Sequence, residues 1–330
     1  MPIKRPMNMT ILPIDINGHT RNFFVDSGIP VSFSTNPSVT HIPAEYCGNR
    51  QSLQLHQQPP AVVHSLERLG GGTLSGFLGT SYIQTTSVRL CLAKNHLAFN
   101  DEPTWEPDFI LPLRGWMVEI ACDDGGNDGQ STWFIDTGSF LSYRWHDNPR
   151  PSHLCSPNWS FPSFQGNIRF DLYPNCTISH NNIKLATVTT ARNFALNPGV
   201  AGMLGANFLV QFDAYFNRKT QELWLKNLHP SSLEVWENPS VEHKTPGFQF
   251  YCVLNEKTNH HKLSVSHHTH THATLPVGTE FTLPNLDSTD PLFVNTAWKY
   301  LYSTEGTDVT VLVNGLEKKL PLQNMFVPVA

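Results

Sequence analysis

Two aspartates in this chain stand in nearly the same local sequence. Residues 23–28 read FFVDSG and residues 133–139 read WFIDTGS. In each segment an apolar run ends on an aspartate, Asp26 or Asp136, which is followed by a small hydroxyl residue and a glycine. An apolar run carries its last residue into the protein interior, where an ionised carboxylate is costly. Two such carboxylates brought together could share one proton and activate a water molecule.

The likeness extends beyond these two tripeptides. Each aspartate is preceded by an apolar segment, residues 11–14 or 110–113, and is followed by GFLGTSYI at 76–83 or GMLGANFL at 202–209. The separation between the copies grows along the chain, and the polar, glycine-rich residues 123–129 are one source of the drift because such loop tips tolerate extra residues. The sequence therefore predicts two duplicated lobes. The alternative is that both motifs are ordinary turns, in which Asp and Gly are favoured.

The pattern resembles the aspartic peptidases of the pepsin and retropepsin kind, with two retropepsin-like lobes fused in tandem across about residues 8 to 228. In that family each lobe gives one Asp from an Asp-Thr/Ser-Gly turn, and a later apolar-Gly pair packs behind the turn. The matching positions are Asp26-Ser27-Gly28 with Leu78-Gly79, and Asp136-Thr137-Gly138 with Leu204-Gly205. The resemblance implies an all-β, bilobal protein with double-psi β-barrel lobes at 1–109 and 110–229 and a small β-rich accessory domain at 230–330.

The resemblance implies that Asp26 and Asp136 form the catalytic dyad of an endopeptidase acting on extended polypeptides. Two adjacent carboxyl groups cannot both ionise, so one keeps its proton. The ionised member acts as general base on a water, while the protonated member polarises the scissile carbonyl. The resemblance also implies that Ser27 and Thr137 hydrogen-bond across the lobe interface. Neither a covalent intermediate nor a metal or other cofactor is expected.

The two glycines and the residues that follow them shape this expectation. Gly28 and Gly138 leave the backbone free to turn and to approach the facing loop. Ser139 follows Gly138 with a hydroxyl that could donate to the carboxylate, whereas Ile29 follows Gly28, where the family usually has Ser, Thr or Ala. An apolar residue without a donor disfavours charge on Asp26, so we expect Asp26 to carry the proton. Ile29 also favours a second interpretation, a catalytically weak or inactive module that binds peptide or protein.

Hairpins that could cover a cleft are harder to place. Residues 53–63 alternate on both sides of a Pro-Pro turn and predict a hairpin in the first lobe. In the second lobe we expect a hairpin over 167–188 that turns near residues 173–175. The family's flap tyrosine has no good match, because Tyr46 lies early in the segment.

Composition bounds the remaining classes. The 330 residues are 39% hydrophobic and 15% charged, with 25 prolines, and short alternating runs between turn signals indicate an all-β protein. The net charge is −5 with no long basic run, so no nucleic-acid partner is expected.

No apolar stretch of the sequence approaches the length of a membrane span. Residues 1–9 lack a signal-peptide core, although a secreted or extracytoplasmic location is slightly favoured. Six cysteines form no CxxC pair, which argues against zinc. Because both lobes are present, we expect a monomer.

The last hundred residues lie outside the repeated pattern. A linker is expected over 229–247, followed by strands at 248–254, 262–266, 279–283 and 309–313, the last turning at Asn314-Gly315 into 317–322. Histidines cluster between His260 and His272. A polar loop or edge strand is the preferred interpretation; metal ligation and a charge switch below about pH 6.5 are the alternatives. The role of this region cannot be read from its sequence.

Overall fold

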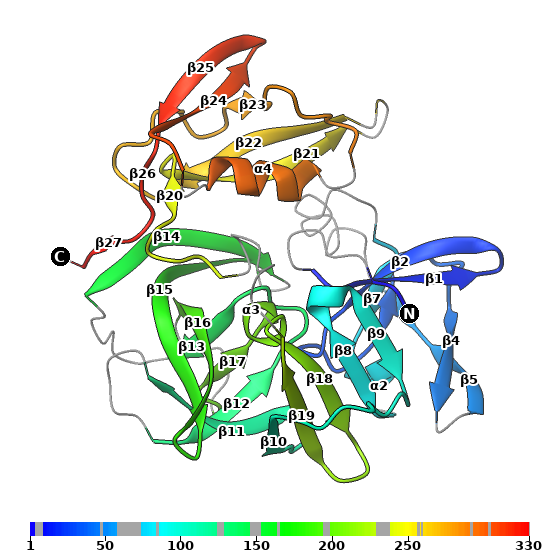
Figure 1. The fold of residues 1–330 in the computed structure, drawn as a ribbon. Helices are drawn as coiled ribbons and strands as arrows, with labels where there is room; N and C mark the ends of the chain where they lie inside the picture. Colours follow the sequence, from blue (N-terminus) through cyan, green and yellow to red (C-terminus); the bar gives the residue numbers. More distant parts are fainter. Residues whose placement is uncertain are drawn as a thin grey trace.

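The computed structural model describes most of the chain and shows a mostly β protein, with 54% of residues in strands and 8% in helices (Figure 1). This confirms the all-β class predicted from the sequence. The residues described are 1–3, 9–46, 49–57, 74–83, 86–123, 129–145, 153–163, 166–193, 199–228, 238–255, 258, 260–290, 293–302 and 305–329.

The first aspartate follows a strand of a five-stranded sheet. Its strands are β1 (Ile11–Ile16), β2 (His19–Val25), β7 (Gly76–Leu78), β3 (Phe33–Ser34) and β6 (His56–Gln57), in the spatial order β1-β2-β7-β3-β6. The β1–β2 hairpin turns at Asn17 and Gly18, both at positive φ, as a two-residue hairpin loop requires. β7 runs parallel to β2 and antiparallel to β3, and the short helix α2 (Thr80–Ile83) follows β7.

The second aspartate follows a strand of a closed six-stranded barrel. The barrel strands are β11 (Met117–Asp123), β12 (Ser131–Ile135), β17 (Gly202–Leu204), β13 (Ser142–Trp145), β16 (Ile183–Asn193) and β15 (Gly166–His180). Pairing of β15 with β11 closes the ring, and β14 (Leu154–Ser163) and then β27 (Val327–Pro328) extend the sheet from β15. β17 lies parallel to β12 and antiparallel to β13, which repeats the β2-β7-β3 arrangement, and the short helix α3 (Ala206–Leu209) follows.

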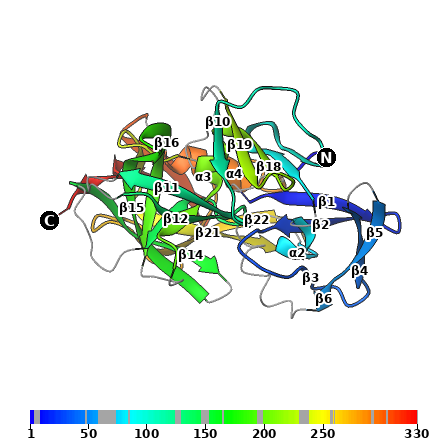
Figure 2. The ribbon, with the colours of Figure 1, turned by 90° about the horizontal axis from the view of Figure 1, so that it is seen from below.

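A further sheet joins strands that come from both halves of the repeat (Figure 2). Its order is β10 (Phe109–Pro112), β19 (Glu222–Asn227), β18 (Phe212–Asn217), β8 (Val88–Cys91) and β9 (His96–Phe99), with the 3-10 turn η2 (Leu92–Lys94) between β8 and β9. The apolar segment at 110–113 forms β10, which pairs with β19, whereas the strand that pairs with β12 is β11; the corresponding segment 11–14 of the first half lies in β1, which pairs with β2. Alternation identifies a half-buried strand but not its neighbour.

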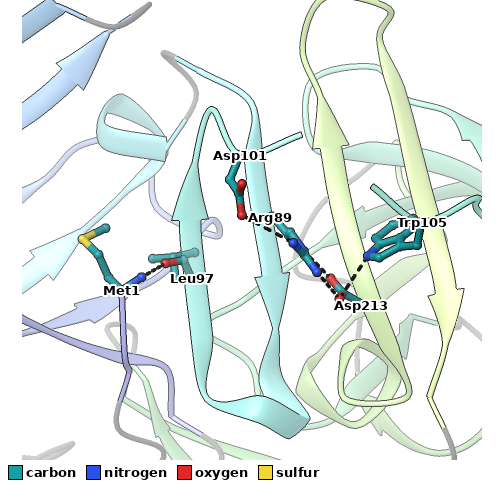
Figure 3. Close-up of polar contacts among 6 residues, drawn as sticks. All are labelled: Met1, Arg89, Leu97, Asp101, Trp105 and Asp213. Atoms are coloured by element: carbon teal, nitrogen blue, oxygen red, sulfur yellow. Dashed lines mark hydrogen bonds and ion pairs between the residues drawn. The ribbon is translucent and has the colours of Figure 1, made fainter. Parts of the chain in front are cut away.

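Hydrogen bonds of charged groups link the strands of this shared sheet (Figure 3). Arg89 on β8 donates from Nε and one terminal nitrogen to the two oxygens of Asp213 on β18, at 3.0 and 2.8 Å. Trp105 Nε1 also donates to Asp213, and the Asp213 side chain is only 5% exposed. At the far edge the amino group of Met1 donates to the Leu97 carbonyl at 2.6 Å. The two halves of the repeat are thus joined by a buried, fully paired carboxylate.

The C-terminal third forms a compact β-rich unit with one helix, placed above β14 in the view of Figure 1. Its elements are β20 (Lys244–Thr245), β21 (Phe248–Asn255), β22 (His260–His268), β23 (Glu280–Phe281), α4 (Phe293–Leu301), β24 (Asp308–Val313), β25 (Leu316–Pro321) and β26 (Gln323–Asn324). The predicted strands and the Asn314-Gly315 turn, at φ 52° and 78°, are confirmed. α4 was missed, although its buried residues recur with helical spacing.

The apolar side chains form two large clusters. One is centred on the barrel and the sheet shared by both lobes. The other runs from Phe24 and Phe77 beside the first aspartate strand, through Phe140 beside the second, to Phe250 and Trp298 of the C-terminal unit. The C-terminal unit therefore shares a core with the region around both aspartates.

Of the two predicted cleft hairpins, the first falls partly outside the described residues, because 58–63 are not described. Within the described part, β4 (His41–Tyr46) forms a hairpin with β5 (Asn49–Gln54), and β6 pairs with β3.

The second predicted hairpin, over 167–188, is wrong in the position of its turn. β15 continues through residues 173–175, where a register shift marks a β-bulge and Asn175 takes a positive φ of 60°. The chain reverses instead at Asn181 and Asn182, between β15 and β16.

Candidate active site

Two equivalent turns bring the aspartates together at the ends of β2 and β12. The Asp26 amide donates to the Leu78 carbonyl and the Asp136 amide donates to the Leu204 carbonyl, each at 2.9 Å. The apolar-Leu-Gly segments identified in the sequence thus lie directly behind the aspartates. Asp26 is 7% exposed and Asp136 is 9% exposed, so both carboxyl groups sit in largely desolvated positions.

The glycines of the two turns lie against the opposite carboxyl groups. A Cβ placed on Gly138 would lie 2.3 Å from Cγ of Asp26, and a Cβ on Gly28 would lie 2.6 Å from an Oδ atom of Asp136. Real Cβ atoms essentially never approach so closely. The dyad therefore requires glycine at both positions for a steric reason. Gly28 is itself exposed and Gly138 half-buried, so solvent reaches the turns from this side.

Four hydrogen bonds fasten the turns to each other through Ser27 and Thr137, which are 1% and 3% exposed. Ser27 Oγ donates to the Ile135 carbonyl at 2.7 Å and accepts from the Thr137 amide at 2.9 Å. Thr137 Oγ1 donates to the Val25 carbonyl at 3.0 Å and accepts from the Ser27 amide at 3.1 Å. Each hydroxyl thus satisfies one donor and one acceptor of the opposite backbone, and the pattern is reciprocal.

The carboxyl groups of Asp26 and Asp136 lie close together, because a Cβ placed on Gly28 would be 2.6 Å from an Oδ atom of Asp136 and 2.9 Å from an Oδ atom of Asp26. Burial raises the pKa of both, and the pKa of Asp26 is raised well above its ordinary value by burial and by its interaction with the Asp136 carboxyl group. The rise for Asp136 is opposed by its hydrogen bonds from Asp26 and from the amides of Gly138, Ser139 and Gly28. Hydrogen bonds to a carboxylate favour its charged form, so Asp26 holds the proton and Asp136 the charge.

The cause of this asymmetry differs from the one expected. Backbone amides, in place of a side-chain hydroxyl, favour the charge on Asp136. Ser139 Oγ donates to the Leu141 carbonyl at 2.7 Å, so the prediction that it donates to the carboxylate is wrong. A carbonyl two residues along the chain is the local partner that a serine in a turn commonly takes. Ile29 is half-buried and packs against the aromatic cluster.

The surroundings of Asp136 are aromatic. Tyr143 on β13 lies opposite Met203 on β17 and contacts Phe170 edge-on, with ring centroids 5.5 Å apart. Burial and the neighbouring Asp136 charge raise the pKa of the Tyr143 hydroxyl, so it stays protonated. Phe140 contacts Phe161 of β14 at 4.3 Å between centroids. Tyr143 and β14 lie outside the repeated motif, so the motif gives no signal for either of them.

The other candidate groups do not converge on the dyad. Within the described residues, no three or more His, Cys, Asp or Glu side chains are placed to hold a metal ion. His267 and His268 bond the carbonyls of Asn158 and Leu275. The five cysteines that the structure describes are free thiols, and Cys47 lies outside that part. No helix in the described part is both long and apolar enough to cross a membrane.

The comparisons with known proteins add no assignment. No protein-family model matches the chain, and no curated protein matches it significantly. The functional argument therefore rests on the geometry around Asp26 and Asp136.

Proposed function

We propose that the protein is an aspartic endopeptidase whose catalytic dyad is Asp26 and Asp136. The observation that carries the proposal is the paired turn: two carboxyl groups from corresponding points of a repeat lie against each other and against the two glycines, and reciprocal bonds of Ser27 and Thr137 fix the turns behind them. Ordinary surface turns would have no reason to bury two carboxyl groups against each other, because like charges at such a distance are unfavourable.

The proposed mechanism uses the asymmetry of the pair. Ionised Asp136 takes a proton from a water held between the carboxyl groups, and the resulting hydroxide attacks the scissile carbonyl carbon. Protonated Asp26 donates a hydrogen bond to the carbonyl oxygen, where negative charge develops. The proton taken up by the dyad then passes to the leaving nitrogen as the C–N bond breaks. The pair titrates as one unit, so activity requires a single shared proton.

The fold supports the same proposal. The β2-β7-β3 and β12-β17-β13 arrangements, each followed by a short helix after Gly79 or Gly205, are what two pepsin-like lobes with double-psi topology would provide. Since one chain supplies both aspartates, the working unit is proposed to be a monomer. An extended peptide between two β lobes would pair through its backbone and place alternate side chains into pockets.

The test is a digest of casein and of a peptide library between pH 3 and 6, with and without pepstatin. Wild-type protein is expected to cleave, while Asp26→Asn and Asp136→Asn lose cleavage and keep their circular dichroism spectra. Asp101→Asn, which changes an exposed carboxylate far from the dyad, serves as the control and retains activity. Cleavage that survives either dyad substitution would refute the proposal.

A second candidate is a peptide-binding module without turnover. It is favoured by Ile29, an apolar residue at the position where the family usually has Ser, Thr or Ala. In that case the dyad substitutions leave peptide affinity unchanged, and wild-type protein binds casein without cutting it.

A further inference from the structure

The outer strand of the β14–β15 hairpin is held by the C-terminal unit through a side chain that acts as a strand partner. Gln249 on β21 accepts from the Ser160 amide with Oε1 at 2.8 Å and donates from Nε2 to the Ser160 carbonyl at 2.6 Å. Gln249 is 5% exposed. One buried amide thus satisfies both backbone groups of a residue whose strand would otherwise have a free edge at this point.

Further contacts hold the same strand at the residues that precede Ser160. His267 Nε2 donates to the Asn158 carbonyl at 2.6 Å. The Trp159 side chain is fully buried, with its ring centroid 6.2 Å from that of Trp298 on α4 and 5.6 Å from that of Tyr302. At its beginning β14 also pairs with β27. Backbone, hydrogen-bonding and aromatic contacts therefore all fix β14 to the C-terminal unit.

The far end of this hairpin reaches the turn that carries Asp136. Phe161, next to Ser160, contacts Phe140, which lies four positions after Asp136. On β15, Phe170 contacts Tyr143, whose hydroxyl senses the Asp136 charge. Phe161 and its cross-strand neighbour Ile168 are only half-buried, so they present apolar surface beside the dyad.

We infer that the C-terminal unit is a clamp that positions the β14–β15 hairpin as the substrate-binding wall on the Asp136 side, with Gln249 as the positioning residue. This inference rests on the proposed function. Gln249 does not touch the dyad; it acts through Ser160 and thereby through Phe161. The C-terminal unit holds β14 in its binding conformation before an extended peptide arrives. Less conformational entropy is then lost when the peptide binds, so the affinity is higher.

The variants are Gln249→Ala and Gln249→Glu, with Lys262→Ala as the control. Lys262 lies on β22 of the same sheet, but it pairs with Glu280 of β23 and both side chains are more than half exposed. Loss of two hydrogen bonds, each with a net effect of about 1 kcal/mol, predicts a rise in KM for casein peptides of about 30-fold in Gln249→Ala. The kcat is expected to stay within about threefold, because the dyad is untouched.

Gln249→Glu separates positioning from general packing. A protonated glutamic acid can accept from the Ser160 amide and donate to its carbonyl, whereas a carboxylate faces that carbonyl without a donor. The ratio of the variant KM to the wild-type KM is therefore expected to be about 1 at pH 4 and to rise as the pH is raised toward 6, which removes the pH dependence that both proteins share through the dyad. A merely structural role would move the unfolding midpoint without this pH-dependent KM.

Hydrogen exchange of the amides of residues 154–170 tests the clamp independently of catalysis. In Gln249→Ala these amides are expected to exchange faster, and in Lys262→Ala they are not. Unchanged KM despite faster exchange would overturn the clamp, as would unchanged exchange. If wild-type protein binds fluorescein-labelled casein without cutting it, the peptidase proposal fails, and the Kd for that casein replaces KM: an unchanged Kd in Gln249→Ala then overturns the clamp as well. If it does not bind casein at all, both fail.

Discussion

The reciprocal bonds behind the dyad make a stability prediction that needs no assumption about function. Ser27→Ala removes one hydroxyl from a fully buried position. The Ile135 carbonyl loses its donor and the Thr137 amide loses its acceptor, and neither gains access to water because the site remains closed. The change therefore leaves two backbone groups buried and unsatisfied.

The magnitude follows from those two groups. Each buried polar group left without a partner costs about 1–3 kcal/mol, so Ser27→Ala should lower the free energy of unfolding by about 2–5 kcal/mol. That is a large part of the ~5–15 kcal/mol typical of a folded protein. Thr137→Ser keeps every bond of the set and should lose about 1 kcal/mol or less, chiefly from one buried methyl group.

The assay is urea denaturation under reducing conditions, followed by tryptophan fluorescence, with Ser38→Ala as the control. Ser38 is exposed and its hydroxyl contacts only a neighbouring side chain, so its removal should change stability by no more than about 0.5 kcal/mol. The reasoning is refuted if Ser27→Ala loses less than about 1 kcal/mol at an unchanged m value, or if Thr137→Ser loses as much as Ser27→Ala.

Three more predictions follow from the same region and the sheet that joins the lobes. Gly138→Ala would displace the Asp26 carboxyl by about 1 Å and should lower kcat by about 100-fold, whereas Gly129→Ala, with open space around it, should not; equal kcat values would contradict this. Because the pKa of Asp26 is raised in the folded state, the free energy of unfolding should fall as the pH rises from about 4 to the folded-state pKa. Asp26→Asn should reduce this fall by roughly 1.4 kcal/mol per pH unit, as measured by urea unfolding from pH 4 to 8. An equally steep fall in the variant would disprove a raised pKa at Asp26. Asp213→Asn breaks a buried pair with a partly exposed arginine and should cost about 2–3 kcal/mol, while Asp101→Asn at the same arginine should cost under about 1 kcal/mol; similar unfolding midpoints would exclude that ranking.

The parts of the site that the sequence could predict are those carried by short, local patterns. Asp26, Asp136 and the Leu-Gly segments behind them are recognisable because an apolar strand, a tight turn and a following helix are each coded within a few residues. The short helices α2 and α3 after Gly79 and Gly205 begin within these same local segments.

The parts that could not be predicted depend on pairing between distant segments. The alternation of apolar and polar residues indicates which face of a strand is buried but not which strand lies beside it. It therefore could not show that β12 pairs with β11 and that β10 pairs with β19. The bulge at residues 173–175 and the turn at Asn181 and Asn182 both contain asparagine at positive φ. Such residues do not show by themselves whether the strand bulges or the chain reverses. The contact of Gln249 with Ser160 spans 89 positions and has no local signature.

The continuous aromatic cluster has a consequence for how this chain can be cut. A clone that stops near residue 230, where the sequence suggests a spacer, would deprive Trp159 of the two rings packed on it, and the excised segment would in turn expose Phe250 and Trp298. Each fragment would then expose an apolar surface that is buried in the full chain. Separate expression should therefore give poorly soluble fragments, and co-expression of the two should restore their solubility.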